Sequence, residues 1–226
     1  MPKPGSQENH AGKITVKSST YKVHVRNKRG THKPAVLNDA CKEASARLLN
    51  ANIPAKIIND AIEPYREQFS RGQLWQRLVS HFRQQLRESS VPDFSTLRDM
   101  DVQENYPLSH ALCSRTEVSA DRAAGTLHAR LICNLAPKFR YTGSLTGYRI
   151  GMVVIYPDVA EKSADTADAY TPVFGLGEEP GTVVFTLPLK ENATQVVLCT
   201  ILEAYEGNKP SGMQSGRAMQ LRGFTI

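Results

Sequence analysis

The sequence predicts an α+β protein, with an N-terminal β-hairpin and a small helical bundle followed by an antiparallel β-sandwich, either immunoglobulin-like or a partly closed barrel. Three observations predict this class. Apolar and polar residues alternate over residues 13–26, apolar residues recur at helical spacing over residues 34–90, and strand-like segments separated by turn residues fill residues 113–226. The same patterns predict four segments: a basic arm and hairpin (1–33), a three-helix bundle (34–90), a linker (91–112) and the sandwich (113–226).

The predicted hairpin has one apolar and one basic face. A turn at Ser18-Ser19 separates two strands of period two. The apolar face holds Ile14, Val16, Tyr21, Val23 and Val25. The basic face and the residues that follow it hold Lys13, Lys17, Lys22, His24, Arg26, Lys28, Arg29 and Lys33. Because an isolated hairpin is marginally stable in water, we expect its apolar face to pack on another part of this chain or on a neighbouring molecule.

Three amphipathic helices are expected next. The first begins near Pro34 and ends at a stop over Asn50-Ala51-Asn52. The second begins near Pro54 and is kinked or split at Pro64. The third spans about residues 73–88, with an apolar stripe facing inward and arginines facing outward. Short connections between such helices favour a small bundle.

The C-terminal half reads as an all-β region. The expected strands lie near Ser114–Ser119, Gly125–Leu135, Tyr148–Tyr156, Thr182–Leu187, Gln195–Tyr205 and Arg217–Thr225, with a further short one at Thr171–Phe174. Residues 153–155 and 196–198 are continuous apolar runs, which predicts central strands covered on both faces, with the helices as one candidate cover.

The sequence holds no recognisable catalytic, metal or cofactor motif. The six histidines lack zinc-ligand spacing, and no cofactor is expected. The paired carboxylates Asp99 and Asp101 suit acid–base chemistry in principle, but no other motif converges on them in the sequence. We expect the four cysteines to be buried free thiols, while a bridge between Cys133 and Cys199 stays open. With no apolar run of membrane length and no secretory pattern at the N-terminus, we expect a cytoplasmic protein without a membrane partner.

Charge is distributed unevenly along the chain of 226 residues, whose net charge is +6. Residues 1–33 carry eight Lys or Arg against one acid, whereas residues 91–226 are net negative. Residues 157–181 are expected to form a long acidic loop, and long loops are often functional. Its acids are Asp158, Glu161, Asp165, Asp168, Glu178 and Glu179.

Three explanations of the basic face remain open. It is a solvated surface, a nucleic-acid-binding ribbon, or an arm that docks on the acidic β domain of a neighbouring copy. The single aromatic residue of the hairpin, Tyr21, falls on the apolar face, so the basic face offers no stacking platform for bases.

The order of elements also resembles a group of uncharacterised bacterial proteins of similar length. The resemblance lies in the basic segment Thr20–Gly30, in Arg47-Leu48-Leu49 within the helical stretch, and in a strand-rich half ending in a short apolar strand. The chain departs from that group just after Gly30, where those proteins carry a longer basic turn. The resemblance implies no activity.

The hypothesis we favour from sequence is a non-enzymatic, self-associating structural or scaffold subunit, a homo-oligomer or filament. The alternative is a nucleic-acid-binding accessory protein that uses the basic hairpin face.

Overall fold

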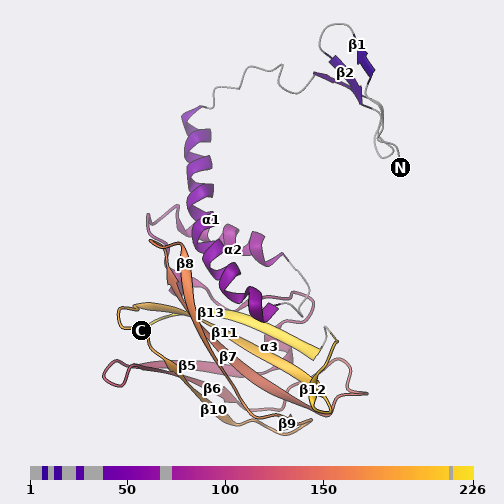
Figure 1. Ribbon diagram of the computed structural model, residues 1–226, viewed down its shortest axis with the longest axis vertical. Coiled ribbons are helices and arrows are strands. Elements are labelled where there is room, and N and C mark those ends of the chain that lie inside the picture. The colour runs from indigo at the N-terminus through magenta and orange to yellow at the C-terminus, as the bar shows by residue number, and fades with distance from the viewer. Residues whose placement is uncertain (1–6, 10–12, 17–23, 28–37, 67–72, 214–215) are drawn as a thin grey trace. The chain divides into compact units, whose positions relative to one another are not determined.

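A computed structural model describes most of the chain (Figure 1). The described residues are 7–9, 13–16, 24–27, 38–66, 73–213 and 216–226. The chain divides into two compact units, Met1–Ala44 and Ser45–Ile226. Among the described residues, no helix combines the length and the hydrophobicity that a membrane span requires.

The N-terminal unit contains a three-stranded antiparallel sheet of short strands, in the order β1-β2-β3. These strands are β1 (Gln7–Asn9), β2 (Lys13–Val16) and β3 (His24–Asn27). The expected turn at Ser18-Ser19 lies outside the described residues, as do Tyr21 and Val23.

The register between β2 and β3 differs from the one that a two-residue turn at Ser18-Ser19 requires. Such a turn places Val16 opposite Tyr21, whereas the structure pairs Val16 with His24 and Ile14 with Arg26. Val25 lies opposite Thr15 and is 56% exposed. The shared apolar face of Ile14, Val16, Tyr21, Val23 and Val25 stays a prediction.

Helix α1 (Asp39–Arg66) is a single helix of 28 residues. The backbone N–H of Cys41 donates to Oδ1 of Asn38 at 2.8 Å, so Asn38 caps the helix. The predicted stop at Asn50-Ala51-Asn52 is wrong, and Pro54 also lies inside the helix. Asparagine costs only about 0.7 kcal/mol in a helix. Burial of an apolar stripe on α1 offsets that cost; its residues are Ala51, Ala55, Ile58 and Ile62.

Helix α2 (Leu74–Gln85) corresponds to the third helix expected from sequence. The expected separate three-helix bundle is not what the described residues form. Instead, α1 and α2 share an apolar cluster with one face of a β-sheet. Figure 1 shows both helices on the same side of that sheet.

The C-terminal unit contains two antiparallel sheets. The small sheet has the order β10-β6-β5, with β5 (Ser114–Asp121), β6 (Thr126–Cys133) and β10 (Thr182–Pro188). The large sheet has the order β4-β13-β11-β7-β8. Its strands are β4 (Met100–Asp101), β7 (Gly147–Asp158), β8 (Ser163–Tyr170), β11 (Gln195–Glu206) and β13 (Arg217–Thr225), with β9 (Phe174–Gly175) beside β7 and β12 (Lys209–Pro210) beside β11.

The large sheet is buried on both faces. On β7, Met152 and Val154 pack in a cluster shared with the small sheet, and Val153 and Ile155 pack in the cluster shared with the helices. Neighbouring residues therefore enter different cores, as the pleat of a strand requires. The α+β class, the antiparallel sheets and the two-sided burial of the apolar runs are confirmed.

Two segments expected to be irregular hold regular structure. The expected linker 91–112 contains the 3₁₀ helix η1 (Phe94–Thr96), strand β4 and the short helix α3 (Leu108–Ala111), and Phe94 is buried. The expected acidic loop 157–181 contains β8, which pairs with β7 over eight residues. The loop prediction is therefore wrong for residues 163–170. Six of these eight residues are Ser, Ala or Asp, which have weak strand preference, and only Thr166 and Tyr170 favour a strand.

The four cysteines are free. Cys133 lies in the core between the sheets and Cys199 in the core beneath the helices, so the large sheet separates the two thiols. Burial raises the pKa of Cys133 to about 11, and burial also raises the pKa of Cys199. Cys41 and Cys113 are exposed, contrary to the expectation that all four are buried.

Candidate functional site

The predicted basic face falls largely outside the described residues. That part includes Lys17, Lys22, Lys28, Arg29 and Lys33. The remaining members of the predicted faces lie in β2 and β3, namely Lys13, Ile14, Val16, His24, Val25 and Arg26.

The predicted acidic residues do not form one patch. Asp165 and Asp168 are three residues apart on β8, so they point to opposite faces of that strand. Asp165 forms an ion pair with Lys190, and Asp168 accepts a hydrogen bond from the Tyr65 hydroxyl at 3.0 Å. Burial and the neighbouring Asp168 raise the pKa of Tyr65. Both carboxylates therefore have partners within the chain.

The other four acids lie in two separate turns. Asp158 accepts a hydrogen bond from the backbone N–H of Glu161 at 3.0 Å and so closes the turn between β7 and β8. Glu178 accepts a hydrogen bond from the backbone N–H of Gly175 at 2.9 Å in another turn, next to Glu179. All but Asp158, which is partly buried, are exposed.

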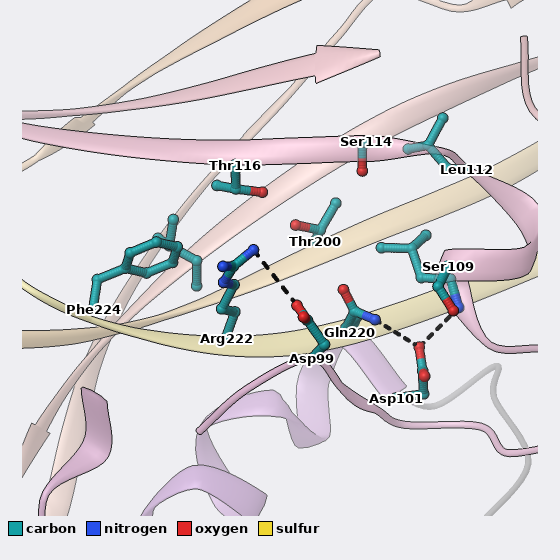
Figure 2. Close-up of a pocket in the computed structure, with 12 residues that line it drawn as sticks. Asp99, Asp101, Ser109, Leu112, Ser114, Thr116, Thr200, Gln220, Arg222 and Phe224 are labelled. Atoms are coloured by element: carbon teal, nitrogen blue, oxygen red, sulfur yellow. Dashed lines mark hydrogen bonds and ion pairs between the residues drawn. The ribbon is translucent and has the colours of Figure 1, made fainter. Parts of the chain in front are cut away.

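The structure instead reveals a polar cleft between the two sheets. It has a volume of about 170 Å³ and lies between β5 of the small sheet and strands β11 and β13 of the large one. Figure 2 shows polar side chains from both sheets directed into this space. The lining residues are Asp99, Asp101, Leu108, Ser109, Leu112, Ser114, Thr116, Leu198, Thr200, Gln220, Arg222 and Phe224.

The cleft lies beside β5, an edge strand of the small sheet. At the other side of the unit, the Lys190 to Asp165 ion pair connects the end of β10 to β8, and the Tyr156 hydroxyl donates to the carbonyl of Pro188 at 2.7 Å. These contacts hold the sheets together there. Within the described part of the chain, the edge strand β5 pairs only with β6, so no strand pairing between described residues joins the sheets beside the cleft.

Asp101 forms one wall of the cleft and is fixed in place from two sides. Its Oδ1 accepts hydrogen bonds from the backbone N–H of Leu108 at 2.8 Å and from the Gln220 amide at 3.1 Å. Burial nonetheless raises the pKa of Asp101, because desolvation of the carboxylate outweighs these bonds and the nearby Arg77. The geometry makes Asp101 a positioned acceptor.

Arg222 lies at the more exposed side of the cleft. Its guanidinium is 3.7 Å from the carboxylate of Asp99 and 5.5 Å from the centre of the Phe224 ring. The ion pair is about half exposed on both sides. Exposed pairs of this kind contribute about 0–1 kcal/mol, so Arg222 and Asp99 can separate at little cost.

Four hydroxyl groups surround the interior of the cleft. Thr200 on β11 is only 7% exposed, and its hydroxyl has the sulfur of Met152, at 3.8 Å, as its acceptor. The hydroxyls of Thr116, Ser114 and Ser109 make no hydrogen bond to any residue that the structure describes. Thr116 is partly buried and Ser114 and Ser109 are exposed, so these hydroxyls are open to hydrogen bonds from water or from a bound molecule.

No three His, Cys, Asp or Glu side chains gather as a metal-binding group within the described ranges. The polar groups of the cleft instead suit hydrogen bonding.

Neither a known protein family nor a curated protein matches this chain. The resemblance to uncharacterised bacterial proteins therefore stays a prediction.

Sequence reasoning found Asp99 and Asp101 but not the residues that face them. Thr116, Thr200 and Gln220 come from three strands that are distant in sequence. One signal was present: Thr200 interrupts an otherwise apolar stretch of a strand covered on both faces. A hydroxyl at such a position needs a partner.

Proposed function

We propose that the protein is a non-enzymatic, self-associating structural subunit whose N-terminal unit docks on another copy. The observation that carries this proposal is the division of the chain. The N-terminal unit holds strands of three or four residues, and such a sheet is too small to bury a core of its own. A separate unit of this size gains stability by packing against a partner.

The first three turns of α1 support the same proposal. Residues 39–50 are exposed apart from Ala44, which is partly buried. Leu48 is 41% and Leu49 is 66% exposed on this segment. An amphipathic helix normally buries its apolar residues, so this segment is a candidate contact surface between copies.

Charge complementarity supports association between copies. Residues 1–33 are strongly basic, and the C-terminal unit offers Glu161 and Glu179 as exposed acids with no ion pair to the described residues. A basic arm and an acidic unit on one chain favour head-to-tail contacts, which close into rings or extend as filaments. Because Asp165 and Asp168 already have partners, the turn at Asp158 and Glu161 is the favoured acidic receptor.

We also infer that the two sheets form a partly closed barrel rather than an immunoglobulin-like sandwich. The ion pair between Asp165 on β8 and Lys190 after β10 supports closure at one edge, and the cleft beside β5 supports an opening at the other. The free thiols on opposite faces of the large sheet do not suit the bridge typical of antibody domains.

Light scattering coupled to size-exclusion chromatography tests the proposal. The full chain is expected to form an oligomer whose mass falls at high salt, because exposed charge pairs are screened. Removal of residues 1–33 is expected to lower the oligomeric order while the thermal melting of the remaining chain stays cooperative. A monomeric full chain refutes self-association. An assembly that disperses on nuclease treatment favours the alternative, a nucleic-acid-binding accessory protein.

A pair of matched substitutions tests the helix segment. Leu49→Glu is expected to reduce the mass of the particle without lowering the melting temperature, since the side chain is exposed. Val184→Glu is the control, because Val184 is 56% exposed on the small sheet, away from α1. If only Val184→Glu dissociates the assembly, the contact surface is the small sheet and the proposed route is wrong.

A further inference from the structure

The polar cleft between β5, β11 and β13 contains more hydrogen-bonding capacity than the protein uses. Thr200 is buried with only a sulfur as acceptor, and Thr116 and Ser114 face it from β5 without a partner in the described chain (Figure 2). Hydroxyl groups rotate, and each donates one hydrogen bond and accepts two. A site lined by such groups recognises a molecule that also both donates and accepts.

The size of the cleft limits what fits. A volume of about 170 Å³ equals on the order of six water molecules. Pockets for drug-sized ligands and cofactors start near 300 Å³, so a nucleotide is too large. A single sugar ring or a polyol of similar size is compatible with the space.

We propose that this cleft binds a small, neutral, polyhydroxylated molecule of about the size of one monosaccharide. In this site Thr200, Thr116 and Ser114 hydrogen-bond the ligand hydroxyls, and Asp101 accepts from one of them. The Phe224 ring and two leucines, Leu112 and Leu198, contact the apolar C–H face of the ring.

The charges in the lining favour a neutral ligand over an anion. Two carboxylates, Asp99 and Asp101, face one guanidinium, Arg222, which Asp99 already pairs. A carboxylate or phosphate ligand therefore meets net negative charge. The same net negative charge attracts small cations, and a cationic comparison probe tests for them.

Binding to the full-length protein tests this proposal and does not depend on self-association. The probes are glucose, mannose, galactose and sorbitol, followed by saturation-transfer NMR and calorimetry, with acetate, phosphate and ethanolamine as charged comparisons. At least one neutral probe is expected to bind in the millimolar range or more tightly. Binding of the charged probes alone, or of no probe, overturns the proposal.

Two threonine substitutions locate the site. Thr200→Val and Thr116→Val remove one hydroxyl each while keeping the side-chain shape, and each is expected to weaken binding about tenfold. Thr182→Val is the matched control, because Thr182 is exposed on β10 and does not line the cleft. Wild-type affinity in both cleft variants, or equal weakening in Thr182→Val, places the binding elsewhere and overturns the proposal. If Thr200→Val does not fold, Thr116→Val on the partly exposed edge strand decides the question.

Discussion

Replacing Gly223 on β13 with alanine tests how the segment before the sheets is held in place. A Cβ atom at Gly223 would lie 1.8 Å from the carbonyl oxygen of Phe94 and 2.9 Å from the Cα of Ser95. Both are backbone atoms of η1, so no side-chain rotation relieves the clash. The segment must move away from the sheet.

The cost follows from the contacts that this movement breaks. The Gly223 N–H donates to the carbonyl of Leu97 at 2.8 Å, and the Phe94 N–H donates to the Gln195 side chain at 2.9 Å. Each hydrogen bond contributes about 1 kcal/mol. In the wild type Phe94 is 3% exposed, and its ring centre lies 5.4 Å from that of Phe82. Moving the segment exposes part of Phe94, which adds a fraction of the roughly 3–5 kcal/mol that loss of a core phenylalanine costs. We expect a loss of about 3 kcal/mol.

Urea denaturation and thermal unfolding of the wild type and of two variants measure this loss. Gly223→Ala is expected to lower the melting temperature by about 6–12 °C, at the usual conversion for a unit of this size. Gly212→Ala is the control, because nothing lies within 4 Å of its Cβ position and its φ is not in the left-handed region. If both variants unfold within about 0.5 kcal/mol of the wild type, η1 is not docked on β13 as described, and the reasoning fails.

Two further predictions concern titratable groups. Burial lowers the pKa of His81, whose Nε2 lies 2.9 Å from the Thr96 hydroxyl. Below about pH 6.5 the unfolded chain binds a proton at this histidine more readily than the folded chain does, so the free energy of unfolding falls as the pH falls. His81→Gln should weaken this pH dependence of the free energy of unfolding, measured by urea titration at several pH values. An unchanged pH dependence in the variant contradicts the prediction. Ellman's reagent should modify Cys41 and Cys113 in the native protein, and Cys133 and Cys199 only after unfolding; rapid modification of a third thiol in the native state contradicts the described burial.

The fold class was predictable because it depends on periodicity. The alternation of apolar residues, the helical stripe of α2 and the continuous runs in β7 and β11 all report which faces are buried. The helix break at Asn50 and the acidic loop were mispredicted because both predictions rested on the conformational preferences of single residues. In neither case did these preferences determine the structure. Tertiary packing keeps α1 continuous at Ala51. Pairing with β7 makes a strand of β8, although most of its residues are Ser, Ala or Asp and do not favour a strand.

The candidate site was less predictable than the fold. Asp101 and Thr200 are about 100 residues apart, and only the strand order brings β4, β11 and β5 around one cleft. Periodicity assigns a residue to one face of its strand, but it does not show which other sheet or helix packs against that face. The sequence therefore identified the carboxylates and missed the hydroxyls that give the cleft its chemistry.

Because the large sheet is buried on both faces, its hydrophobic pattern alone does not specify the strand register. In a sheet with one wet face, a shift by one residue exposes the apolar side chains, but a strand such as β7 is apolar on both faces over residues 152–155. Correct pairing must then depend on a few irregular positions. Arg149 bonds Glu203 across the strands at 2.7 Å, and Gly151 leaves room for the Tyr170 ring, which lies 2.4 Å from where a Cβ would be. These residues therefore fix the register of β7 against its neighbours. Substituting them should shift the strand pairing, and not only lower the free energy of unfolding.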